Sequence, residues 1–144
     1  MADHAGPISD ILPHGAPTDD GARLLLHAIR RMGLGGINDA HAVNAMIGSF
    51  GLSFRRPLVL MRALMAELSR ASQRSIIIAP SCCVRMTAAE SVLVQAIATA
   101  THAPHDAHRR LCEICGIINC LGLLSSAQAV AQAFADLGRP INTA

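Results

Sequence analysis

One segment, residues 57–71, most constrains what this chain can fold into. It reads PLVLMRALMAELSRA, with only Arg62, Glu67 and Arg70 charged. Proline suits the first turn of a helix, and the residues after it are apolar on almost every side of the helix that they would form. Such a helix needs neighbours that cover it, so it belongs in the middle of a helical bundle.

The amino-acid composition also favours a helical bundle. Hydrophobic residues make up 51% of the 144 and charged ones 15%, yet the chain has three Phe and no Tyr or Trp. A core of small aliphatic residues favours close-packed helices over a β-sandwich, whose strands are enriched in aromatic residues. The length is typical of one domain. We therefore predict an all-α fold, a single compact bundle of five or six helices over residues 18–141.

Local signals place the elements of this bundle. Residues 1–17 contain three prolines and little periodicity, which predicts a flexible N-terminal arm. Gly35 and Gly36 should end the first helix. Side chains able to cap a helix stand at the expected helix starts: Thr18 or Asp19, Asn38 or Asp39, Thr87 in a capping box with Glu90, Asp106, and Ser125 or Ser126.

Residues 75–79, SIIIA, are the one β-like run. A lone short strand has no partner within the chain, so this run is either an extended connector or an edge available to a second copy. Together with a mean hydropathy of +0.38, it predicts self-association or a protein partner. No apolar run is long enough to span a membrane, and the N-terminus lacks the features of a signal peptide. We expect a cytoplasmic protein.

Several function classes are disfavoured. All twelve basic residues are Arg, which excludes Schiff-base chemistry and the P-loop lysine. A net charge of +2, with only three aromatic residues to stack on bases, argues against nucleic acid as a partner. No GxSxG, HExxH or GxGxxG motif is present, so a binding or regulatory protein is favoured over an enzyme.

Five cysteines provide the most specific chemistry. An odd count in a cytoplasmic chain indicates free thiols or metal ligands. On a helix that continues to the glycine at 122, His108, Cys112 and Cys115 fall within an arc of about 60°, while Cys120 lies about 140° from Cys115. With Cys82 or Cys83 they would complete a zinc or iron–sulfur site. The predicted ligands are therefore Cys82, Cys83, Cys112, Cys115 and His108.

Two alternatives stay open. The cysteines are also small hydrophobic residues that pack in cores, and the protein would then be a metal-free helical interaction module. Alternatively Cys82 or Cys83, placed before a helix N-terminus and beside Arg85, would act as a redox-active thiol. Because adjacent side chains point apart, only one of this pair would join a metal site.

Three short motifs carry a family resemblance: FRRPL at 54–58, CCVRMT at 82–87 and FADLGRP at 134–140. They resemble motifs of an uncharacterised family of small alphaproteobacterial proteins, over most of residues 20–141. The resemblance implies a self-standing bacterial domain. It implies no activity.

Overall fold

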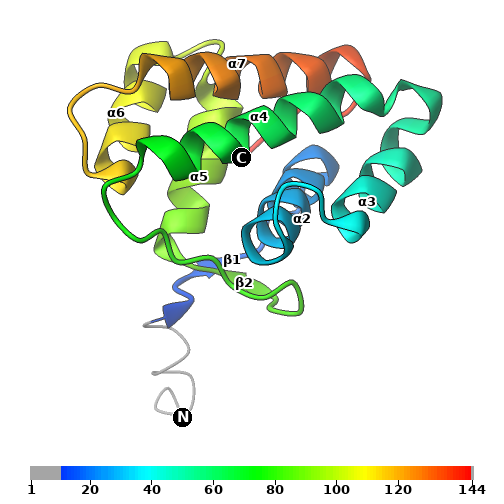
Figure 1. Ribbon diagram of the computed structural model, residues 1–144, viewed down its shortest axis with the longest axis horizontal. Helices are drawn as coiled ribbons and strands as arrows, with labels where there is room; N and C mark the ends of the chain where they lie inside the picture. Colours follow the sequence, from blue (N-terminus) through cyan, green and yellow to red (C-terminus); the bar gives the residue numbers. More distant parts are fainter. Residues whose placement is uncertain (1–10, 144) are drawn as a thin grey trace.

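In the computed structural model, which describes residues 11–143, the chain forms six α-helices and a β-ladder of two residues per strand (Figure 1). The helices are α2 (Asp20–Gly35), α3 (Ala40–Phe50), α4 (Arg55–Ala71), α5 (Ala88–Thr99), α6 (Pro104–Cys115) and α7 (Leu121–Asp136). A 3-10 turn, η2 (Gly51–Ser53), joins α3 to α4. Strand β1 (His14–Gly15) pairs antiparallel with β2 (Arg85–Met86). The predicted all-α class is confirmed.

The helices pack mainly in two pairs. Helix α4 lies along α7, and α5 packs against α6, with α2 beneath α4 and α3 at the far end (Figure 1). The buried hydrophobic residues are aliphatic or contain sulfur, apart from Phe134 and Phe50, whose rings meet edge to face with centroids 5.2 Å apart. Helix α4 buries Met61, Leu64 and Leu68 but exposes Val59 and two alanines. The rest of its exposed side consists of Ser and Arg residues. Because this side exposes little apolar area, the helix needs to be covered on one side only.

Three predicted helix starts are confirmed. The Asp19 side chain accepts from the Ala22 N–H at 2.9 Å, and the Asp39 side chain accepts from the Ala42 N–H at 3.0 Å. Thr87 and Glu90 form the capping box that begins α5. Each uses a side-chain oxygen to satisfy an N–H that has no partner within the helix.

Two predicted starts were wrong. Helix α6 begins at Pro104, and Asp106 lies in its first turn, where it pairs with Arg109 and Arg110. Helix α7 begins at Leu121, four residues before the predicted cap at Ser125. The reason is that α6 stops early, at Cys115, which leaves residues 116–120 as the whole connection between the two helices.

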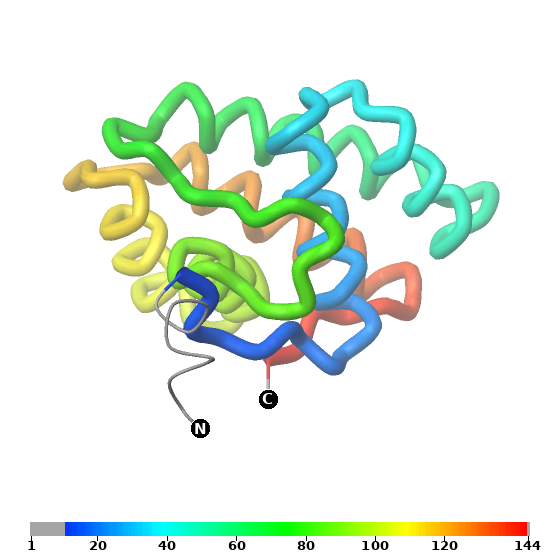
Figure 2. Tube along the Cα trace, turned by 90° about the horizontal axis from the view of Figure 1, so that it is seen from below, coloured from blue at the N-terminus to red at the C-terminus, as the bar shows by residue number. Residues whose placement is uncertain are grey.

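The run at 75–79 lies in an extended connector between α4 and β2 and forms no strand (Figure 2). Ile76 and Ile78 pack onto the core, whereas Ile77 is 66% exposed. The connector is held by Arg30 of α2, which donates to the carbonyl of Cys83 at 2.7 Å. Residues 1–10 of the predicted arm lie outside the described residues, and residues 14–15 form β1. No described helix has both the length and the apolar character needed to cross a membrane.

Candidate metal centre

The connection between α6 and α7 turns back over the end of α6. Gly116 adopts φ 69° and ψ 35°, the left-handed conformation that ends helices. The amides of Gly116 and Ile117 both donate to the carbonyl of Cys112, at 2.9 and 3.1 Å. The Arg74 side chain packs against this glycine and donates to the carbonyl of Glu113 at 3.0 Å. The turn brings the end of the loop, at Cys120, back to the side of α6.

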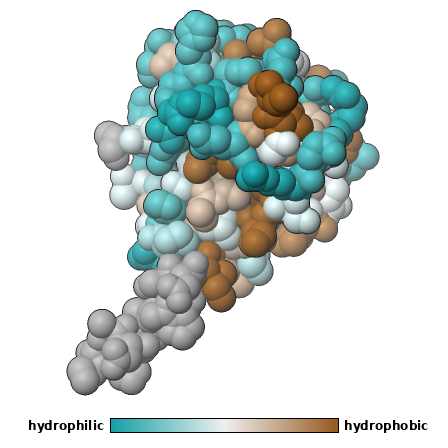
Figure 3. Space-filling model, turned by 90° about the vertical axis from the view of Figure 1, so that its left-hand side faces the viewer, coloured by the Kyte–Doolittle hydropathy of each residue, from teal (hydrophilic) through white to brown (hydrophobic). Residues whose placement is uncertain are grey.

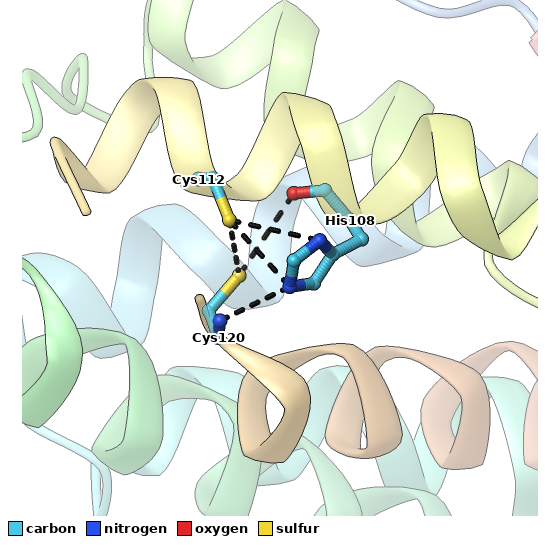
Figure 4. A group of neighbouring side chains, drawn as sticks. All are labelled: His108, Cys112 and Cys120. Atoms are coloured by element: carbon cyan, nitrogen blue, oxygen red, sulfur yellow. Dashed lines mark hydrogen bonds between the residues drawn. The ribbon is translucent and has the colours of Figure 1, made fainter. Parts of the chain in front are cut away.

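Three sulfur and nitrogen side chains meet at this point (Figure 4). The Sγ atom of Cys112 lies 3.2 Å from Sγ of Cys120 and 3.6 Å from Nε2 of His108. The backbone N–H of Cys120 donates to His108 Nε2 at 3.1 Å. One potential ligand atom from each residue lies within 4.8 Å of the other two.

The two elements contribute differently. His108 and Cys112 are four residues apart on α6, a spacing that places side chains on one face of a helix. Cys120 precedes α7 and reaches the group only because the loop reverses at Gly116. The loop backbone also approaches the sulfur atoms, with the carbonyl of Ile118 3.5 Å from Cys112 Sγ. The group therefore depends on the loop conformation as well as on the helix.

The three residues differ in their access to solvent. Cys120 is buried, and this burial, with the neighbouring Cys112 sulfur, raises the pKa of the Cys120 thiol to about 12. A metal ion would have to displace that proton, since the thiolate is the ligand. His108 and Cys112 are half-buried and line an open cleft of about 540 Å³, together with Arg74 and Ile118. The group is closed by Cys120 on one side and open to this cleft on the other.

Two thiols and one imidazole form a ligand set suited to zinc. Zinc sites with three protein ligands, Cys₂His among them, leave a fourth tetrahedral position for water or another ligand. Within residues 11–143, no fourth Cys, His, Asp or Glu joins the group. Iron–sulfur clusters are usually held by four cysteines, so the set fits a single zinc ion better.

The other predicted ligands lie elsewhere. Cys115 is fully buried in the core, where desolvation raises its pKa and a hydrogen bond with Ser72 partly offsets that rise. Cys82 and Cys83 precede β2, away from the α6–α7 loop (Figure 1), and line a separate cleft beside Arg30. The structure thus brings together His108 and Cys112 of the predicted set and leaves the other three cysteines apart.

Cys120 was missed because a continuous helix was expected through it. Helix α6 ends at Cys115, so the expected angle of 140° between Cys115 and Cys120 does not apply. Gly116 directly follows the C-x2-C pair and was the signal for this ending, because glycine is the preferred residue just past a helix C-terminus.

A family model described as a family of unknown function, DUF6628, matches residues 3–138. The chain belongs to this family. The DUF6628 match includes His108 and all five cysteines, and it confirms the resemblance to an uncharacterised family that the three sequence motifs indicated. No curated protein and no solved structure matches the chain.

Proposed function

We propose that this DUF6628 protein is a small zinc-binding protein, with His108, Cys112 and Cys120 as the three protein ligands. The observation that carries the proposal is the convergence of one nitrogen and two sulfur atoms within 4.8 Å of one another. The pair on α6 alone would be a common helical spacing. The addition of a third soft ligand from a separate segment is what supports a metal site over chance proximity.

The open side of the group suggests the kind of role. With three protein ligands, the fourth position of a zinc ion would be available to water or to a small ligand. The half-buried His108 and Cys112 line the cleft, which gives such a ligand a route to the metal. We infer a cytoplasmic binding or regulatory role, as the sequence favours, in which zinc ligation also stabilises the α6–α7 loop.

Metal analysis tests this proposal. Protein purified without chelator should contain one zinc per chain, and a competing chromophoric chelator should report its affinity. Cys112→Ser and Cys120→Ser should each lower the zinc affinity by more than about 10-fold. Substitution of residues that only hydrogen-bond to metal ligands already lowers metal affinity by about this factor. Cys82→Ser, at an exposed thiol of the same chain, is the matched control and should keep the zinc. Failure of the wild type to bind zinc, or full binding by both site variants, would overturn the proposal.

A metal-free interaction module is the second candidate. The face at the α6–α7 end carries hydrophobic residues framed by hydrophilic ones (Figure 3). In this region Ile118 is 97% exposed and Leu121 61% exposed. Exposed apolar residues of this kind are typical of protein contacts. If the chain self-associates through them, sedimentation at about 50 µM, where weak dimers form, should show a dimer. Ile118→Ser should then dissociate it, whereas Leu52→Ser, at an exposed residue beside α3, should not.

A redox role for Cys82 or Cys83 has less support. The Arg85 guanidinium, expected to activate them, donates instead to the carbonyls of Leu12 and Pro13, at 2.8 and 2.9 Å. Arg30 contacts this segment through the Cys83 carbonyl and not through a thiol. In neither contact does the guanidinium group meet a thiol.

A further inference from the structure

Cys112 and Cys120 are close enough to react with each other. Their sulfur atoms are 3.2 Å apart, and a disulfide bond requires a separation of about 2.05 Å. The two residues come from different elements, the last turn of α6 and the residue before α7. Closing the remaining gap requires a movement of about 1 Å, shared between two side chains and a short loop.

The two sulfur atoms differ in their access to solvent, which suits them to different steps of such a reaction. Cys112 is half-buried and lines the open cleft, so a small oxidant in solution can reach its sulfur. Cys120 is 6% exposed and lies behind it. The Nδ1 atom of His108, the ring nitrogen that does not accept the Cys120 amide, lies 3.8 Å from the Cys112 sulfur, within reach of its proton. In the loop, Ile118 and Asn119 are exposed, so few packing contacts hold these two residues, which lead into the buried Cys120.

We propose that Cys112 and Cys120 form a dithiol pair that hydrogen peroxide oxidises to a disulfide, and that this oxidation releases the metal. The metal-release part rests on the proposed zinc-binding function. The disulfide itself does not, because it needs only the two thiols and the oxidant.

The chemistry balances in two steps. The Cys112 thiolate attacks one peroxide oxygen, the O–O bond breaks, and the products are a Cys112 sulfenic acid and hydroxide, which takes up the proton that Cys112 lost. The Cys120 sulfur then attacks the Cys112 sulfur, the S–O bond breaks, and the hydroxyl leaves as water with the Cys120 proton. Two thiols are oxidised and one peroxide is reduced to two waters. Neither sulfur is then a thiolate, so both metal ligands are lost together.

The disulfide is tested first on metal-free protein. One equivalent of peroxide should lower the intact mass by two hydrogens. After denaturation and alkylation, cleavage at Arg110 and Glu113 releases residues 111–113, which contain Cys112 alone. In a Cys115→Ser variant, a disulfide between this fragment and the peptide that begins at Ile114 can only be the Cys112–Cys120 bond. In Cys120→Ser, the bond should be absent and a Cys112 sulfenic acid should be trapped by dimedone.

Zinc-loaded protein is tested next. Peroxide should release zinc to a chromophoric chelator, one ion for each disulfide formed, and a reductant should restore binding. If the disulfide forms but zinc never binds, the oxidisable pair stands and the zinc function fails. If zinc binds but no Cys112–Cys120 bond forms under peroxide, the function stands and this inference is wrong. A disulfide that involves Cys82 or Cys83 in place of this pair would also overturn it.

Discussion

Arg30 of α2 and Glu90 of α5 form a doubly hydrogen-bonded ion pair inside the protein, with Nε–Oε2 at 2.8 Å and Nη2–Oε1 at 3.0 Å. Their side chains are 4% and 0% exposed. The Glu90 carboxylate also accepts the amides of Ala79 and Thr87, at 3.1 and 2.9 Å. Arg30 binds the carbonyls of Cys83 and Arg85. A buried charge pair therefore holds the connector to the bundle.

Removal of one member of this pair should strongly destabilise the fold. Glu90→Gln keeps the side-chain shape but leaves the Arg30 charge buried without an opposite charge, which costs about 3–5 kcal/mol in comparable cases. Urea denaturation measures the free energy of unfolding. The control is Asp136→Asn, which breaks the ion pair between Asp136 and Arg56. The side chains of Arg56 and Asp136 are 52% and 42% exposed, so this substitution should have little effect on stability. Equal effects of the two substitutions would contradict the structural importance of the buried pair.

Gly116 should be required for both stability and zinc affinity. An alanine there would hold a left-handed conformation at a cost of about 1–2 kcal/mol, and its Cβ would lie 2.7 Å from Nε of Arg74. Relief of that contact requires the Arg74 side chain or the loop that carries Cys120 to shift. Gly116→Ala should thus lower the stability and weaken zinc binding. In Gly48→Ala, within α3, the new Cβ meets no atom within 4 Å, and the change should be neutral or stabilising. Unchanged zinc affinity in Gly116→Ala would show that the loop does not position Cys120.

Asp39 should contribute to the loss of stability in acid. Hydrogen bonds from Arg31 hold the pKa of Asp39 below the ordinary value of 3.8. Partial desolvation acts in the opposite direction, and the hydrogen bond from the Ala42 amide lowers the pKa further. Because the folded state favours the carboxylate, the contribution of Asp39 to stability is present above pH 3.8. It is lost as the pH falls through the lowered pKa. Asn also caps helices well, so Asp39→Asn isolates the charge. Unfolding free energies from about pH 6 to pH 3 should fall less steeply in this variant than in the wild type. Parallel curves would contradict the assignment.

Local signals in the sequence predicted much of the fold. Asp19, Asp39 and Thr87 cap the helices where expected, since a cap involves residues only three or four apart. The Arg30–Glu90 pair was not predicted, because its members are 60 residues apart and only the packing of α2 on α5 brings them together. The sequence identified Glu90 as part of a capping box, but its ion pair with Arg30 depends on that packing.

The candidate site was predictable to the extent that it is helical. His108 and Cys112 were placed on one face by their spacing of four residues, and the structure brings them together. That spacing rule holds only while the helix continues. Within α6 the same rule assigned Cys115 to the group, whereas that side chain is buried in the core. Beyond Gly116, where the helix has ended, it excluded Cys120, whereas the chain reverses and returns Cys120 to the group. Metal binding by any of these residues stays a prediction.

X-ray absorption at the zinc edge tests the central claim most directly, because it counts the atoms bound to the metal. Zinc-loaded wild type should show two sulfur ligands at about 2.3 Å and at least one imidazole nitrogen at about 2.0–2.1 Å. Cys120→Ser should lose one sulfur, and Cys82→Ser should keep both. A shell of four sulfurs, a shell without sulfur, or an unchanged spectrum in Cys120→Ser would contradict a site built from His108, Cys112 and Cys120.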